Sequence, residues 1–103
     1  MAIKVQEIKW ERAEPVNTTN ATASSPVSSN CADIMFINIT TDKVYLIDGI
    51  PLPPLSTMVD GCNAGEWNTH TYQVQGDAPT ISGTLLLGLY VRRKKYGKII
   101  EIN

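Results

Sequence analysis

The stretch LIDGIPLPPLSTMVDG, residues 46–61, rules out both a long helix and a central strand in the middle of the chain. Its three prolines each lack a backbone N–H and hold φ at about −65°. They also push the residues before them into extended geometry. We therefore expect an extended crossing along the edge of a sheet, with the prolines outside the hydrogen-bonded ladder. The apolar side chains that we expect to be buried there are Ile50, Leu52 and Leu55.

Short strand patterns lie on both sides of this crossing. Before it stand DIMFINIT (33–40) and KVYLI (43–47), and after its own STMV (56–59) stand HTYQVQ (70–75), GTLLLGLYVRR (83–93) and KIIEIN (98–103). These runs are rich in β-branched and aromatic residues, and no segment has a convincing helical period. KKYGK (94–98) predicts a hairpin turn between the last two strands, with Gly97 at positive φ. The sequence thus predicts an all-β fold, a small antiparallel β-sandwich of jelly-roll type with an extended N-terminal arm.

The strand pattern GTLLLGLYVRR has apolar residues on two faces. Leu85, Leu87, Leu89 and Val91 lie on one face, and Leu86 and Tyr90 lie on the other, beside Gly88. A sandwich strand normally shows water a polar outer face. We therefore expect this outer face to be covered, either by the N-terminal arm or by another subunit.

The composition changes near residue 30, which predicts an arm over residues 1–30 and a sandwich domain over residues 31–103. Residues 15–30, PVNTTNATASSPVSSN, carry no charge and little apolar surface. Because ordering each backbone residue costs about 1–2 kcal/mol, either the protein's own sheet or a neighbouring chain must hold this stretch. Before this stretch, the apolar residues Ile3 and Val5 alternate in one phase, and Ile8 and Trp10 alternate in the opposite phase. This change indicates an extended strand with a bulge between the two pairs. We predict that residues 1–30 are an assembly arm held in place by other chains, with Ile3, Val5, Ile8 and Trp10 as its apolar anchors.

Basic residues are concentrated near the C-terminus. Residues 92–103 hold five basic residues and one acidic residue, a net charge of +4, whereas residues 1–91 carry −5. This pole is either a solvated hairpin tip or a contact for the acidic face of a neighbouring subunit. Nucleic acid is disfavoured, since the rest of the chain is acidic and only Tyr96 could stack on a base. The predicted contact residues are Arg92, Arg93, Lys94, Lys95 and Lys98.

No set of residues predicts catalysis. His70 is the only histidine, and no G-x-S-x-G pattern accompanies it, so we expect no enzyme. Cys31, Cys62 and His70 lack the paired spacing of a zinc site, and DGCNAGE (60–66) lacks the ligand spacing of an EF-hand calcium loop. We therefore expect no metal and no cofactor. The two cysteines are expected to be small buried thiols rather than a disulfide.

The predicted compartment is a cytoplasm. The start of the chain, MAIKVQEIKWERAEP, has no apolar run like that of a signal peptide. No stretch approaches the roughly 20 apolar residues of a membrane span. We accordingly expect no membrane partner.

Residues 36–74, FINITTDKVYLIDGIPLPPLSTMVDGCNAGEWNTHTYQV, resemble a pattern found in small β-sandwich virion proteins of tailed bacteriophages. The final part of the pattern is a loop that leads into a strand: Gly61, Asn63, Gly65, Glu66, Thr69, Thr71, Tyr72 and Val74. Such proteins decorate capsids, act as adaptors or form fibre bases, and they have no catalytic residues. The resemblance implies a structural virion protein, made in the host cytoplasm, that packs against copies of itself and other virion proteins. The alternative is a carbohydrate- or surface-binding module that uses exposed Trp67 and Tyr72.

Overall fold

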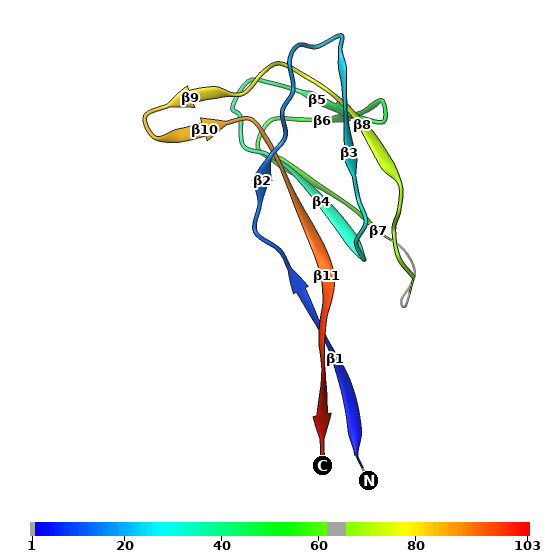
Figure 1. Ribbon diagram of the computed structural model, residues 1–103. Coiled ribbons are helices and arrows are strands. Elements are labelled where there is room, and N and C mark those ends of the chain that lie inside the picture. Colours follow the sequence, from blue (N-terminus) through cyan, green and yellow to red (C-terminus); the bar gives the residue numbers. More distant parts are fainter. Residues whose placement is uncertain (1, 62–65) are drawn as a thin grey trace.

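The structure is a computed structural model that describes residues 2–61 and 66–103. These residues form eleven strands and no helix, and every strand pair is antiparallel (Figure 1). The prediction of an all-β fold is confirmed. Among the described residues there is accordingly no helix that could span a membrane.

Two sheets and a separate hairpin make up the molecule. The larger sheet has the order β1 (Ile3–Trp10), β11 (Leu89–Ile102), β4 (Asp33–Asn38) and β7 (Ser56–Gly61), and the short β2 (Glu14–Pro15) also pairs with β11. The smaller sheet has the order β3 (Ser24–Ser28), β8 (Thr71–Gln75), β5 (Tyr45–Ile47) and β6 (Ile50–Leu52). The separate hairpin consists of β9 (Thr80–Ser82) and β10 (Leu85–Leu87) and projects from the body (Figure 1). Two antiparallel sheets agree with the predicted sandwich, while the jelly-roll topology stays a prediction.

The core lies between the two sheets. Along β4 the burial alternates, with Ile34, Phe36 and Asn38 inside, as a strand with one covered face requires. The ring of Phe36 meets that of Tyr72 on β8 edge to face, with 5.2 Å between the ring centroids. The other large core residues are Tyr45, Ile47, Leu52, Val74, Leu89 and Val91. Burial of such a side chain contributes about 1.5–3 kcal/mol each, so this layer is the main stabilising feature of the fold.

Residues 16–30, within the expected arm, lie against the chain's own sheets. Val16 and Val27 belong to the core, and β3 pairs with β8 over its whole length. The Asn20 side chain accepts hydrogen bonds from the backbone N–H groups of Thr22 and Ala23, which fixes the turn before β3. The strand pairing therefore crosses the expected boundary at residue 30, and the chain's own sheet, rather than the predicted neighbouring chain, holds the low-complexity stretch.

The prediction for the proline segment is right for Leu52 and wrong for its apolar neighbours. Leu52 is buried, but Ile50 is 57% exposed and Leu55 is 71% exposed. Asp48 and Gly49 both have positive φ, the geometry of a type I′ hairpin turn, and this turn folds β6 back on β5. The segment thus begins as an edge strand of the smaller sheet, and only residues 53–55 make the predicted crossing, to β7 in the larger sheet.

The prolines of this segment also depart in part from the prediction. Pro51 lies inside β6, opposite Leu46 on β5, so the prediction that no proline would join the ladder is wrong for this residue. A proline is tolerated there because β6 is the last strand of its sheet, and its missing N–H can face away from β5.

Two further predictions about the C-terminal strands are wrong. Residues 94–98 make no hairpin turn, because β11 runs without a break for 14 residues and takes β1 as its partner. The expected strand 83–93 is interrupted at Gly88, where a Cβ atom would lie only 2.9 Å from the Pro79 side chain. Leu85 and Leu87 consequently belong to the projecting hairpin, whereas Leu89 and Val91 enter the core.

Candidate assembly surface

The two chain ends form a ribbon that projects from the sandwich (Figure 1). The pairing of β11 with β4 ends at Lys94, and from there on β11 pairs only with β1. We call residues 3–9 and 95–102 the terminal ribbon. The ribbon contributes to the elongated shape of the molecule, whose principal extents are 55 × 30 × 18 Å. A two-stranded ribbon standing alone in water is marginally stable. The stability of this ribbon therefore depends on contacts that cover its faces.

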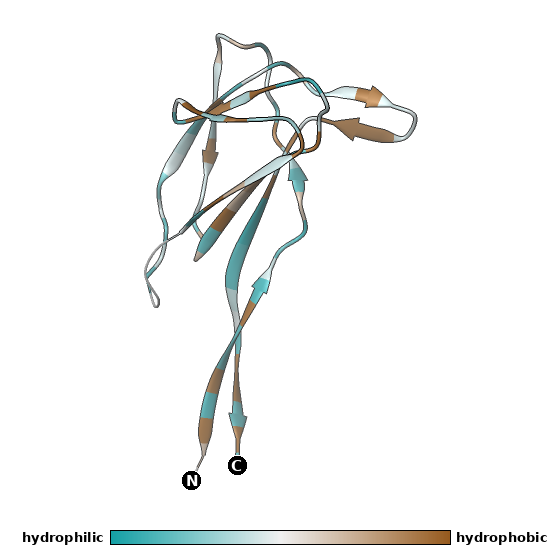
Figure 2. Cartoon of the chain, turned by 180° about the vertical axis from the view of Figure 1, so that it is seen from behind, coloured by the Kyte–Doolittle hydropathy of each residue, from teal (hydrophilic) through white to brown (hydrophobic). Residues whose placement is uncertain are grey.

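Apolar side chains lie on both faces of the terminal ribbon. Ile3 is opposite Ile102 and Val5 is opposite Ile100, and these two pairs lie on one face. Ile8 and Ile99 lie on the other face, since Ile99 is opposite Gln6, two residues from Ile8. Brown segments accordingly recur along both strands of the ribbon in Figure 2. The six aliphatic residues are between 43% and 62% exposed: Ile3, Val5, Ile8, Ile99, Ile100 and Ile102.

The terminal ribbon contains a bulge, while strand alternation alone puts its aliphatic residues on two faces. The register shifts between Gln6 and Ile8, where the sequence predicts a bulge in the N-terminal strand; the position is confirmed, but the strand that holds the extra residue is not the predicted one. The extra residue belongs to β11, because Glu7 is opposite both Gly97 and Lys98. Neither face of the ribbon is therefore a polar, water-facing side.

Aromatic and cationic side chains hold the base of the ribbon. Trp10 is opposite Lys94, and the Arg92 guanidinium and the Lys94 ammonium lie 5.9 and 5.5 Å from its ring centroid. Trp67 lies against Tyr96, with 5.6 Å between the ring centroids, and its indole N–H donates to the Asn30 side chain over 2.8 Å. These contacts fix the ribbon to the body of the sandwich.

Most of the predicted basic contact residues interact with their own chain. Lys94 is 3.4 Å from the Asp33 carboxylate and Lys95 is 3.2 Å from that of Glu11. Arg92 donates to the Glu11 carbonyl, and Arg93 pairs with Glu14. Lys98 is exposed at the bulge, and no ion pair links it to the described part of the chain. The structure thus brings the apolar anchors and the basic cluster, separated by 80 residues or more, onto the same pair of strands.

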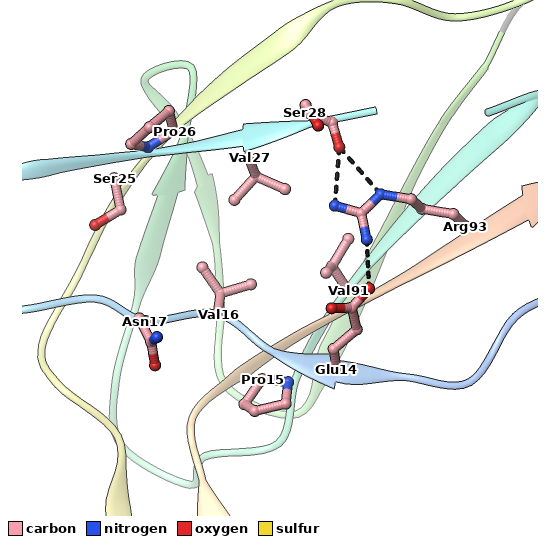
Figure 3. Close-up of a pocket in the computed structure, with 10 residues that line it drawn as sticks. All are labelled: Glu14, Pro15, Val16, Asn17, Ser25, Pro26, Val27, Ser28, Val91 and Arg93. Atoms are coloured by element: carbon pink, nitrogen blue, oxygen red, sulfur yellow. Dashed lines mark hydrogen bonds and ion pairs between the residues drawn. The ribbon is translucent and has the colours of Figure 1, made fainter. Parts of the chain in front are cut away.

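Arg93 closes one open side of the sandwich. Its guanidinium donates to the Ser28 carbonyl on β3 and to the Glu14 carboxylate beside β11 (Figure 3). The hollow behind it has a volume of about 460 Å³ and is lined mainly by small polar residues, proline and valine. Pro26 sits in the middle of β3, the outermost strand of its sheet. Proline and a capped carbonyl both prevent another strand from pairing at this edge.

The opposite open side of the sandwich contains what we call the acidic hollow. It has a volume of about 350 Å³ and lies between β5, β6, β7 and β8. Its lining residues are Ile47, Asp48, Ile50, Met58, Val59, Asp60 and Tyr72. Sequence reasoning missed this group, because no local pattern joins the Asp48 turn to the end of β7.

Hydrogen bonds fix the polar groups of the acidic hollow. The Tyr72 hydroxyl donates to the Asp60 carboxylate over 2.5 Å and accepts from the Asn68 amide over 2.9 Å. Burial, followed by the hydrogen bond to Asp60, raises the pKa of Tyr72 to about 12. Asp48 accepts from the Gln73 backbone N–H and lies 2.6 Å from His70 Nε2, and the hydrogen bond from Gln73 lowers the Asp48 pKa most.

The predicted aromatic pair of a binding module is not exposed as a pair. Tyr72 is only 4% exposed because it packs in the core against Phe36, so the prediction of its exposure is wrong. Trp67 is 39% exposed and packs on Tyr96 at the base of the ribbon.

Residues considered for metal binding are only partly described. Cys31 is completely buried, and His70 is exposed just before β8. The described residues contain no cluster of three potential metal ligands. The predictions that involve Cys62 and the centre of the 60–66 loop lie outside the described residues.

Comparisons with known proteins give no relative of this chain. No family model, no curated protein and no solved structure matches it.

Proposed function

We propose that the protein is a structural protein that assembles through its terminal ribbon. In this proposal it associates with copies of itself and with another structural protein of a virion, as a decoration, adaptor or fibre-base protein. The observation that carries the proposal is a projecting two-stranded ribbon with aliphatic residues on both faces. Large exposed apolar surfaces mark interaction sites in soluble proteins.

The energetics of burial support an interaction role. Six aliphatic side chains on the ribbon are each about half exposed. Complete burial of one such side chain contributes about 1.5–3 kcal/mol relative to full exposure. Covering the ribbon therefore supplies several kcal/mol towards association, before the entropy cost of binding. The same surface left in water would favour non-specific aggregation.

A second apolar projection supports contacts with more than one neighbour. On the hairpin β9–β10, Ile81 is 77% exposed and Leu85 is also exposed, and the hairpin is brown in Figure 2. The Tyr90 hydroxyl donates to the Leu86 carbonyl and ties the hairpin to the start of β11. Ribbon and hairpin leave the body in different directions, which suits a protein placed between two others (Figure 1).

The virion part of the proposal is supported by the resemblance over residues 36–74 and by the small antiparallel sandwich. The binding-module alternative loses one of its two aromatic residues, because Tyr72 is buried. We therefore do not propose it.

Size-exclusion chromatography with light scattering tests the assembly role. We expect the wild-type chain to form oligomers. The variant Val5→Lys/Ile100→Glu should be monomeric, because it places charges on the apolar face of the ribbon. Val5 and Ile100 are cross-strand partners, so the introduced pair preserves net charge and supports the ribbon itself. A matched control, Val44→Lys/Leu55→Glu, alters two exposed aliphatic residues outside the ribbon and the hairpin and should leave self-association unchanged.

Particle composition tests the virion role. Mass spectrometry of purified virus particles from the source of the chain should find it in stoichiometric amounts, and the Val5→Lys/Ile100→Glu variant should be missing from them. The proposal fails if the wild-type chain is monomeric and absent from particles.

A further inference from the structure

We propose that the terminal ribbon of one copy docks in the acidic hollow of the next copy, head to tail. This inference rests on the proposed assembly role of the ribbon and adds the identity of its receptor. Three independent properties of the acidic hollow match the ribbon: its apolar residues, its charge and the sheet edge beside it.

The first match is apolar. Ile50 and Val59 line the acidic hollow and are each more than half exposed. Met58 in the hollow is partly buried and packs on the core, whereas Val59, opposite Met35, points to the outer face of the larger sheet. The hollow thus offers an apolar floor with exposed Ile50, and the edge strand β7 adds Val59 on its outer face, to the aliphatic side chains of the ribbon.

The second match is in charge. The ribbon holds four lysines and two glutamates, a net charge of +2, and Lys4 and Lys98 have no ion pair with the described residues. The hollow holds the carboxylates of Asp48 and Asp60. Within residues 2–61 and 66–103, only His70 among the basic side chains is within ion-pair distance of either carboxylate. Such complementarity steers association and selects the partner.

The third match is the sheet edge. Each outer strand of the smaller sheet contains a proline, Pro26 in β3 and Pro51 in β6. The strand β7 ends the larger sheet beside the acidic hollow and contains no proline. An unprotected edge accepts an added strand through main-chain hydrogen bonds. A ribbon strand can therefore continue the larger sheet from β7 while its side chains enter the hollow.

Two other receptors within a second copy fit less well. Ribbon against ribbon would bring together two surfaces that each carry +2. The projecting hairpin has exposed aliphatic residues but no charged residue between Thr80 and Leu87. Since ribbon and hollow are different surfaces, their contact is heterologous, and repeated contacts give a ring or a filament.

A mixing experiment tests the head-to-tail contact. It uses the ribbon variant Val5→Lys/Ile100→Glu and a hollow variant, Ile50→Lys/Val59→Glu, both without change in net charge. We expect each variant alone to be monomeric, because each has lost one half of the contact. Mixed in equal amounts, they should form a one-to-one dimer and nothing larger, since only one intact ribbon and one intact hollow can meet. Native mass spectrometry with one isotope-labelled variant identifies this dimer.

Other outcomes overturn the inference in distinguishable ways. If the hollow variant self-associates like wild type and the ribbon variant does not, ribbons pair with each other, and only the proposed function survives. If wild type is monomeric but the ribbon variant is lost from particles, the ribbon binds a different protein and the inference is again overturned. If neither variant changes self-association or incorporation into particles, the inference and the proposed function both fail.

A milder pair of substitutions covers the case in which a variant does not fold. Lys4→Glu/Lys98→Glu changes two exposed side chains and leaves the aliphatic residues in place. We expect this change to weaken self-association at least about tenfold at low salt, and high salt should weaken wild type more than the variant. Equal affinity and equal salt dependence in the two proteins would overturn the inference.

Discussion

Trp10 on β1 lies directly opposite Lys94 on β11, and the Lys94 ammonium is 5.5 Å from the centre of the indole ring. The backbone N–H of Glu11 donates to the Arg93 carbonyl in the next position of the ladder. Because hydrogen-bonded and non-hydrogen-bonded pairs alternate in antiparallel strands, Trp10 and Lys94 form a non-hydrogen-bonded pair, whose side chains approach more closely. The pair stands where the ribbon leaves the sandwich, so it controls how firmly the ribbon is held.

We expect Trp10→Ala to loosen the ribbon without unfolding the sandwich. The substitution removes two cation–π contacts, each worth about 0.5–1 kcal/mol at an exposed site, together with the packing of the ring. Hydrogen exchange of monomeric protein should be faster in residues 3–9 and 95–102 and unchanged at Ile34 and Phe36. Trp10→Phe keeps a ring and should lie between wild type and Trp10→Ala. An equal increase of the hydrogen-exchange rate in the ribbon and in the core would show that Trp10 stabilises the whole fold.

Leu52→Ala and Leu55→Ala should have very different effects. Leu52 is buried in the core, and its truncation should lower the free energy of unfolding by about 2–5 kcal/mol. Leu55 is largely exposed, and its truncation should change that energy by less than about 0.5 kcal/mol. Leu55 also has φ of 56°, a conformation that favours glycine, so Leu55→Gly should not destabilise the protein. Urea denaturation of the three variants measures these energies, and equal losses at the two leucines would contradict the burial described here.

Asn38→Leu should be strongly destabilising although the new side chain is apolar. The buried Asn38 amide donates to the carbonyls of Lys43, Leu52 and Pro53, and its oxygen accepts from Thr40. Each buried polar group left without a partner costs about 1–3 kcal/mol. Thermal unfolding should reveal a large loss in Asn38→Leu. Asn20→Leu serves as the control in an exposed turn and should have the smaller effect. Similar losses at the two positions would mean that the Asn38 hydrogen bonds contribute little.

Stability should fall in alkali because of Tyr72. Its pKa is raised from 10.0 to about 12 in the folded protein, so folding favours the neutral phenol. The stability contributed by this shift is complete below pH 10 and is lost as the pH rises towards 12. Tyr72→Phe should remove this part of the alkaline loss, and Asp60→Asn should lower the Tyr72 pKa by removing an adjacent carboxylate. Absorbance of the ionised phenol follows the titration, and a Tyr72 pKa near 10 in the folded protein would refute the prediction.

Sequence alone determined the local features of this protein. Runs rich in β-formers predicted the all-β fold, the prolines predicted that residues 50–55 lie along a sheet edge, and the change of phase between Val5 and Ile8 marked the position where the register with β11 shifts. The apolar and basic residues of the ribbon were also singled out, although not as one surface. These features are readable because strand phase, φ preference and the missing N–H of proline depend only on a residue and its close neighbours.

Tertiary structure alone decided which strands pair and what is covered. KKYGK has the composition of a turn, yet it stays extended because β1, about 90 residues away, supplies a partner along its whole length. Strand alternation places Tyr72 and Val74 on the same face of β8, but only the packing of the Phe36 ring against Tyr72 decides that this face is buried. The exposure of Ile50 likewise follows from the place of β6 at a sheet edge, and that of Leu55 from its place in the connection between β6 and β7. Such choices depend on the sum of many contacts between distant residues, and no local pattern contains that sum.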